Sequence, residues 1–152
     1  MIQFLHSGCA LLVGTADASG RPHGSRAWGL TVIDLDPVSV RLLVDSADVT
    51  TLANLQPDAL VAITAASVTT LRSLQMKGRV VRREPATEVD ENKRVQYTTD
   101  FTNDIHKTDG DPLVIVRAWA DRSVVPCIVD VDAIFDQTPG PAAGAAMSGS
   151  PE

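Results

Sequence analysis

Six short segments of apolar and β-branched residues, separated by turn-forming residues, constrain the fold of this chain more than any other feature. The turns at 17–20 (Asp-Ala-Ser-Gly) and 34–37 (Asp-Leu-Asp-Pro) have the spacing of hairpins. Within 71–83 apolar and polar residues alternate, which is the period of a strand with one apolar face. The pattern predicts strands over residues 8–16, 23–33, 38–44, 59–65, 71–83 and 124–135.

Two other segments have the features of helices. Residues 49–55 follow the capping residues Ser46 and Asp48 and end before Pro57. Residues 86–105 are charged and contain no glycine or proline, which is typical of a surface helix. A further segment, 111–120, fits a helix and a strand equally well. Six strands and two helices predict a closed or nearly closed antiparallel barrel, because closure removes exposed strand edges; a sandwich is the alternative.

A change in composition at residue 137 separates the expected domain from a tail. The length of 152 residues favours one domain, which we place at 1–136. Residues 137–152 are rich in proline, glycine and alanine, a composition that does not support regular structure. The first part of the tail is either a frayed end or a segment that docks on a partner subunit. Beyond Gly144 we expect disorder.

Charge and composition argue against several classes of function. A formal net charge of -6 and an aromatic fraction of 4% are unsuited to nucleic-acid binding. No apolar run is long enough to span a membrane, and the first residues lack the basic segment of a secretory signal. Cys9 and Cys127 lie in apolar surroundings, as expected of buried, reduced thiols in a cytoplasmic protein. The spacing of the histidines and cysteines predicts no metal site.

Three segments, taken in order, resemble a known family. They are GCALLVGTADASGRPHGSRAWG at 8–29, RLLVDSADVTTLANLQPDALVAI at 41–63 and TLRSLQMKGRVVRREPAT at 70–87. Together they resemble the pyridoxamine 5′-phosphate oxidase-like, FMN-binding split-barrel family, and VDVDAIFDQTPGPAAG at 129–144 is similar to the ending of one bacterial branch of it. The resemblance implies an all-β (β-rich α+β) fold, a six-stranded antiparallel split barrel with flanking helices.

The resemblance also implies a homodimer with two equivalent cofactor sites at the subunit interface. In such a dimer FMN would lie against the second, third and fifth strands, and a small-molecule substrate would bind beside it. The implied cofactor-binding positions are Ser25, Arg26, Ala27 and Trp28 on the second strand, Ser73 and Gln75 on the fifth, and Ser46, Thr50 and Thr51 around the phosphate.

The chemistry of the charged and hydroxyl residues leaves alternatives open. Arg26 suits a phosphate because a guanidinium is planar and always charged, but an exposed arginine on a strand also pairs with acids. The hydroxyls of Thr50 and Thr51, with free N–H groups at a helix start, suit an oxyanion. On the residues alone, a simple helix cap by Ser46 or Asp48 is the favoured interpretation of this segment.

The other candidate residues also have two interpretations. Gln75 can donate to and accept from the edge of a ring, and Ser73 faces the same way, yet a solvated sheet face has the same pattern. Trp28 lies among small residues and either covers a flat ring or packs in the core or a dimer interface. Packing is the favoured role for a lone tryptophan, whereas the two interpretations of Gln75 are equal.

The leading functional hypothesis is an FMN-dependent oxidoreductase of unidentified substrate, in which the cofactor supplies the redox chemistry and no catalytic residue is assigned. Typical flavin-binding members have a basic pair where this chain has Asp48 and Val49. This departure favours a second hypothesis, a non-catalytic split-barrel binding protein that has lost flavin. A third is a deazaflavin (F420)-dependent reductase. Haem is the least favoured cofactor, because no histidine stands out as an axial ligand.

Overall fold

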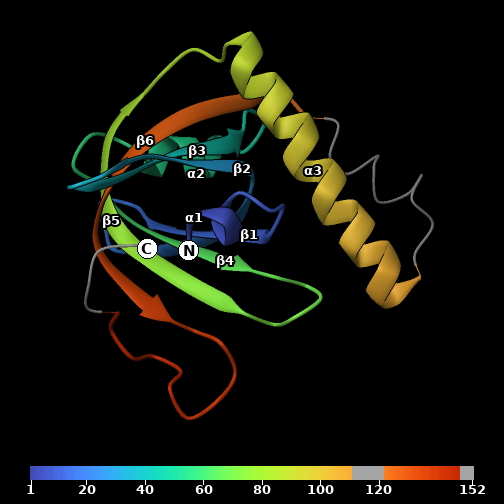
Figure 1. The fold of residues 1–152 in the computed structure, drawn as a ribbon. Helices are drawn as coiled ribbons and strands as arrows, with labels where there is room; N and C mark the ends of the chain where they lie inside the picture. The colour runs from blue at the N-terminus through green and yellow to red at the C-terminus, as the bar shows by residue number, and fades with distance from the viewer. Residues whose placement is uncertain (111–121, 148–152) are drawn as a thin grey trace.

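The computed structural model describes residues 1–110 and 122–147, and these residues form a six-stranded barrel with three helices. The barrel is closed and antiparallel, with the strand order β1-β2-β3-β6-β5-β4, as the sequence predicted (Figure 1). The ambiguous segment 111–120 lies outside the described residues. In chain order the elements are α1 (Ile2–Leu5), β1 (Ala10–Ala16), β2 (Pro22–Leu35), β3 (Val38–Asp45), α2 (Val49–Asn54), β4 (Leu60–Ala66), β5 (Ser73–Arg83), α3 (Glu88–Asp109) and β6 (Val124–Asp136).

The barrel interior is filled by alternate side chains of every strand. On β5 the residues from Leu74 to Val80 are buried at every second position, which confirms the two faces predicted from the alternation. Burying an aliphatic side chain contributes about 1.5–3 kcal/mol, so this core supplies most of the driving force for closure. The largest fully buried side chains include Leu5, Leu30, Leu42, Leu43, Leu55, Ile63, Leu74, Met76 and Tyr97.

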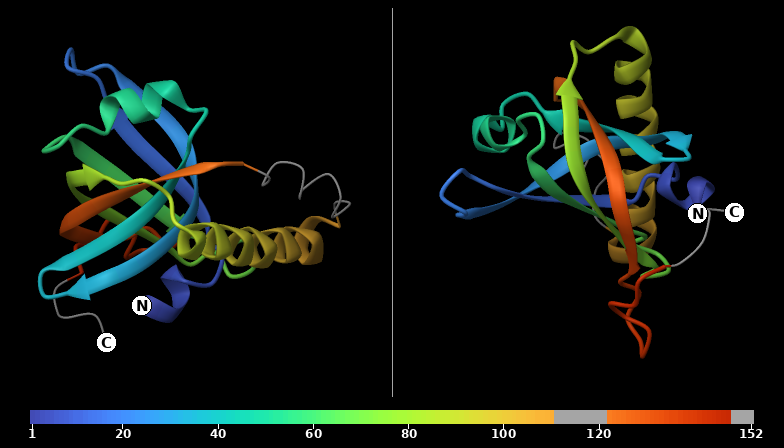
Figure 2. Two further views of the ribbon diagram at one scale, coloured as in Figure 1. Left: turned by 90° about the horizontal axis from the view of Figure 1, so that it is seen from above. Right: turned by 90° about the vertical axis from the view of Figure 1, so that its left-hand side faces the viewer.

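Helix α3 runs along one side of the barrel and extends beyond it (Figure 2). Thr87 and Asp90 form a capping box at its start, and Gly110 ends it in the left-handed conformation. Arg41 of β3 binds both carboxylate oxygens of Asp90, with Nε–Oδ1 and Nη2–Oδ2 distances of 2.6 and 2.9 Å, and it also pairs with Glu84. A bidentate pair of this kind fixes the first turn of α3 on the barrel.

The N-terminal segment fills the space between α3 and the barrel, and sequence reasoning did not predict its short helix α1. Tyr97 of α3 donates its hydroxyl to the Leu5 carbonyl at 3.1 Å. The His6 ring accepts the Val32 N–H at 2.9 Å. Gly8 has a φ of +77°, and a Cβ atom there would come within 2.8 Å of three α3 atoms, the nearest at 2.6 Å. Only glycine allows so close an approach.

A β-bulge interrupts the regular pairing of β5 with β6. The register shifts between Lys77 and Gly78, so that Asp132 is the extra residue on β6. A Cβ atom at Gly78 would lie 1.9 Å from the Asp130 carbonyl oxygen, which explains why glycine occupies this position.

The start of the tail folds back on β6, where we had expected a frayed end or a segment docked on a partner. The Gln137 N–H donates to the Ser73 carbonyl at 2.8 Å, and the Met147 N–H donates to Ile134 at 2.8 Å. Phe135 and Ala146 form a β-bridge, so residues 145–147 are ordered, contrary to the predicted disorder, whereas residues 148–152 lie outside the described residues. The turn of this segment projects from one end of the barrel (Figure 1).

Replacing Asp90 with asparagine tests the attachment of α3. Hydrogen bonds from Arg41 lower the pKa of Asp90 to about 2, so its stabilising contribution is complete above about pH 4 and is lost as the pH falls toward 2. We expect Asp90→Asn to lower the free energy of unfolding by about 2 kcal/mol at pH 7, and by much less near pH 2. Urea denaturation at both pH values measures the difference.

The matched control for this variant is Asp104→Asn. Asp104 forms an exposed pair with Lys107 on the same helix, at 2.9 Å, and its loss should cost less than about 0.5 kcal/mol. An equal loss of stability in Asp90→Asn at neutral and acidic pH would contradict the assigned role of the ion pair.

Candidate functional site

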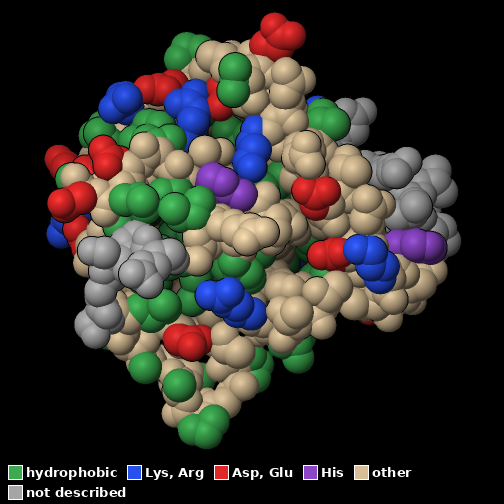
Figure 3. Space-filling view, in the orientation of Figure 1, with side chains coloured by type: hydrophobic (Ala, Val, Ile, Leu, Met, Phe, Trp, Pro, Cys, Tyr) green, Lys and Arg blue, Asp and Glu red, His purple; other side chains and the backbone are tan. Residues whose placement is uncertain are grey.

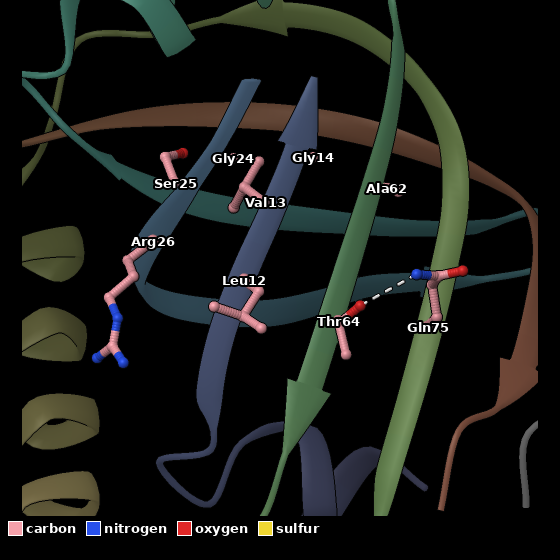
Figure 4. A pocket seen from close by; sticks show the side chains of 9 residues that line it. All are labelled: Leu12, Val13, Gly14, Gly24, Ser25, Arg26, Ala62, Thr64 and Gln75. Atoms are coloured by element: carbon pink, nitrogen blue, oxygen red, sulfur yellow. Dashed lines mark hydrogen bonds between the residues drawn. The ribbon is translucent and has the colours of Figure 1, made fainter. Parts of the chain in front are cut away.

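A hollow of about 450 Å³ lies on the outer face of the barrel, across β2, β1, β4 and β5 (Figure 4). It is open to the outside, and its floor is the sheet itself. Three of the predicted site residues, Ser25, Arg26 and Gln75, line it. Among the described residues, the lining is Leu12, Val13, Gly14, Gly24, Ser25, Arg26, Ala62, Thr64 and Gln75.

Strand register explains the shape of this hollow. One cross-strand row runs from Arg26 through Leu12 and Thr64 to Gln75. With strands about 4.8 Å apart, that row is about 14 Å long. The next outward row consists of Gly24, Gly14 and Ala62, in the same strand order. Because none of these three has a side chain larger than a methyl group, the floor is flat, and a flat ring can approach the backbone.

The outer face remains apolar beyond the hollow. A second hollow of about 280 Å³ shares Gly14 and Ala62 with the first and extends to Leu60 and Lys77. Leu12 and Leu60 project from β1 and β4 and are 50% and 65% exposed. Exposed leucines beside a row of glycine and alanine form a contiguous apolar surface, which in soluble proteins marks a ligand or protein interface.

Arg26 lies at one end of the hollow with an available charge. Its guanidinium extends toward α3 (Figure 4) and lies 5.9 Å from the centre of the Phe101 ring. Within residues 1–110 and 122–147 it forms no ion pair with an acid, so the alternative that Arg26 is an acid-paired strand arginine finds no partner there. A guanidinium held only by an aromatic ring can accept an anionic ligand.

Gln75 lies at the other end, while Ser73 does not reach the hollow. Gln75 Nε2 donates to the Thr64 hydroxyl at 3.2 Å, which orients the amide and leaves its oxygen available (Figure 4). Ser73 instead contacts the tail: its N–H donates to the Thr138 hydroxyl at 3.1 Å, and its own hydroxyl donates to the Leu71 carbonyl. The structure therefore separates the two predicted β5 positions.

Ala27 and Trp28 are packing residues in this chain. Ala27 belongs to the barrel core, and Trp28 packs against Leu43 and Val124 in a smaller buried cluster. The space between Trp28 and α3 has a volume of only about 10 Å³. A ring does not fit in this space. The surroundings of Trp28 therefore agree with packing, the favoured interpretation, and not with a residue that covers a ring.

The start of α2 is a closed polar cluster. The side chain of Asp48 caps the helix by accepting the Thr51 N–H at 2.9 Å, and the buried Thr51 hydroxyl donates to the Ser25 hydroxyl at 2.8 Å. Burial is the largest single influence and would raise the pKa of Asp48, but the hydrogen bonds from Thr51, together with His23 and Ser25, outweigh it and hold that pKa below its usual value. Thr50 and Ser46 are exposed at this end.

The residues present thus fit one part of an FMN molecule and not the other. The flat floor, with Gln75 and Arg26 at its two ends, suits the ring. The start of α2 does not suit the phosphate, because an ionised Asp48 occupies the position and accepts the Thr51 N–H itself. The three residues implied for the phosphate, Ser46, Thr50 and Thr51, are therefore not brought together around an open anion site.

Sequence reasoning missed the floor of the hollow. Gly14 and Gly24 are paired across the β1–β2 hairpin, as are Leu12 and Arg26. Both pairs are symmetric about Ser19 in the turn, so mirroring the two strands about Ser19 would have placed both pairs on one face. No comparable signal links β1 to β4, which brings in Ala62.

Neither a metal site nor a membrane span is found in the parts of the chain that the structure describes. Those residues contain no group of three His, Cys, Asp or Glu side chains able to hold a metal ion. No described helix is both long and apolar enough to cross a membrane. On the face that carries α1 and α3, basic and acidic side chains are interspersed (Figure 3), which does not suit a polyanion.

Substitution of Thr51 separates a structural role from a phosphate-binding role. We expect Thr51→Val to lower the free energy of unfolding by about 1–2 kcal/mol, because it leaves the Ser25 hydroxyl without its buried donor. Thr50→Val, at the exposed neighbouring position, should change stability by less than about 0.5 kcal/mol. Thermal denaturation without ligand measures both, and equal effects would contradict the closed cluster.

Comparison with known proteins adds evidence on the fold. No family model matches the sequence, and no curated protein matches it. Among solved structures, HupZ from Group A Streptococcus is 17% identical with a TM-score of 0.56, over 94% of this chain and 96% of that one. An FMN-binding protein from Syntrophomonas wolfei subsp. wolfei is 11% identical with a TM-score of 0.56, over 89% and 82%. An F420 reductase is 16% identical with a TM-score of 0.54, over 87% and 93%. The protein therefore has the split-barrel fold of pyridoxamine 5′-phosphate oxidase-like proteins.

Proposed function

We propose that the protein is a homodimeric oxidoreductase that binds a flavin-type ring in the hollow on its outer face. The observation that carries this proposal is the flat floor of Gly24, Gly14 and Ala62, bounded by Arg26 and Gln75. Two of the similar structures are an FMN-binding protein and an F420 reductase, which supports a flavin or deazaflavin as the ring. Haem is a weaker candidate, because no histidine lines the hollow.

Each lining residue has a distinct part in this proposal. The bound ring supplies the transfer of electrons or a hydride. The glycine floor brings one face of the ring against the backbone, and Leu12 excludes water from its edge. Gln75, oriented by Thr64, donates to or accepts from the polar edge of the ring. Arg26 holds an anionic group of the cofactor or of the small-molecule substrate.

A second copy of the chain is the proposed cover of the hollow. A ring on an open sheet has one face exposed to water, which weakens both its binding and the electrostatic contacts around it. The apolar surface of Leu12, Leu60 and the small residues between them is suited to burial against an identical surface. The substrate pocket would then lie between the two subunits.

Leu60→Arg tests the dimer. A charge in the middle of the apolar face should be costly to bury, so we expect wild-type protein to sediment as a dimer and Leu60→Arg as a monomer. The control is Val95→Arg, which places the same charge at an exposed position of α3 and should leave the dimer intact. A wild-type protein that sediments as a monomer at micromolar concentration would contradict the proposed interface.

A non-catalytic binding module is the second candidate function. The observation in its favour is the carboxylate of Asp48 at the start of α2, where typical flavin-binding relatives have cations. Such a module would keep the barrel and bind a different planar molecule or none. Flavin-type binding followed by reduction of the bound ring distinguishes the two functions.

Ligand binding tests the proposed cofactor site. We expect riboflavin, FMN or F420 to raise the melting temperature of the wild-type protein, because a ligand that binds only the folded state stabilises it. Gly24→Leu should abolish the shift by filling the floor, where an added Cβ meets no atom within 4 Å and the fold is undisturbed. Arg26→Met should weaken the anionic ligands and leave riboflavin unchanged. A shift that persists in Gly24→Leu would place the ligand elsewhere.

A further inference from the structure

We propose that the hollow selects ring ligands that carry no phosphomonoester, so that it binds riboflavin in preference to FMN, and that Asp48 is the residue that enforces this selection. The inference rests on the proposed function, because it concerns the ligand of the same site. Three observations support it: the carboxylate of Asp48 beside the hollow, the backbone N–H groups near it that are already hydrogen-bonded, and Arg26 as the one cation among the described lining residues.

One acid, Asp48, stands beside the β2 end of the hollow, at the start of α2. Asp48 lies beside Ser25, a lining residue, and is linked to it through Thr51. His23 is its nearest basic neighbour, with an Nε2–Oδ1 distance of 3.6 Å. Asp45, three residues earlier, is paired with Arg122 at 3.0 Å. A phosphomonoester carries close to two negative charges at neutral pH, and here it would face the carboxylate of Asp48.

Most of the backbone donors of this segment are already engaged. The Thr51 N–H donates to the Asp48 side chain, and the Ala47 N–H donates to the Asp45 side chain at 2.8 Å. The Ser46 N–H donates to the Ser123 carbonyl at 2.9 Å. The N–H groups of Asp48, Val49 and Leu52 donate to backbone carbonyls within the same segment. Phosphate recognition needs several free donors, and this segment has a carboxylate in their place.

At the same β2 end of the hollow, next to Ser25, the described residues offer one positive charge. Arg26 is the one basic residue in the lining among the residues that the structure describes. Lys77 lines the neighbouring hollow, where its ammonium lies 4.8 Å from the centre of the Phe135 ring. A single guanidinium balances a carboxylate or a phosphodiester but not a dianion with an acid nearby. The site therefore suits a neutral or singly charged ligand.

The experiment compares riboflavin with FMN, which differ only in the phosphate. Fluorescence titration of the wild-type dimer should give at least about tenfold tighter binding of riboflavin, and the ratio should shrink in high salt as the repulsion is screened. Asp48→Asn should reduce the ratio by several-fold through tighter FMN binding. Asparagine also caps helices, so the fold is preserved. The control is Asp109→Asn, which removes an exposed charge at the end of α3 and should leave the ratio unchanged.

The outcomes distinguish this inference from the proposed function. FMN binding as tight as riboflavin, or tighter, overturns the inference and leaves the flavin site standing. A ratio that is the same in wild type and Asp48→Asn overturns the role of Asp48. Failure of riboflavin, FMN and F420 all to bind overturns the proposed function and the inference with it. The proposal is supported if the wild-type protein binds riboflavin more tightly than FMN and Asp48→Asn reduces that difference.

Discussion

Closure of the six-stranded sheet is the constraint on which the rest of the structure depends. Closure sorts every strand residue into an inward position that packs the core or an outward position that is available to other molecules. On β1 the inward residues Leu11 and Val13 are buried, and Leu12 and Gly14, which alternate with them, face out. The floor of the candidate site is thus made by outward positions that the core does not use.

The polar groups around the barrel divide into two kinds. Arg41 and Asp90 satisfy each other and hold α3 in place, so they are structural. Arg26, by contrast, has no acidic partner in the described residues and lies at the edge of a hollow, as expected of a ligand-binding cation. Asp48 caps α2, and in the proposed function it also sets the charge beside the ligand. A single carboxylate would then both stabilise a helix and restrict what the site accepts.

The elements with local signals were predictable, and those that depend on distant contacts were not. Alternation along β5 gave the correct faces, because strand geometry alone determines which side chains share a side. Helix α1 has no side-chain cap, and its last residue, Leu5, accepts a hydrogen bond from Tyr97, which is 92 residues away in the chain. The fold of the tail depends on hydrogen bonds between Ser73 and Thr138. Sequence patterns carry little information about contacts over such separations.

The same limit applies within the candidate site. Arg26 and Gln75 were expected at the cofactor, and both line the hollow. Trp28 and Ser73 have the right residue types, but their partners Leu43 and Thr138 could be found only from the folded chain. Thr51 was predicted to be either a helix-start residue or an anion ligand. It is buried in α2 and donates its hydroxyl to Ser25, which supports the first.

The pairing of β3 with β6 also has a consequence for synthesis of the chain. Ser39 of β3 pairs with Asp130 of β6. During translation this edge of β3 therefore stays unpaired until β6, the last strand, has left the ribosome. Until then its unpaired backbone groups could join those of another nascent chain, the usual route to aggregation. Arg41, in the middle of that edge, places a charge where such intermolecular pairing would begin. A charge at this position disfavours such pairing, so the residue that anchors α3 would also oppose aggregation of the unfinished barrel.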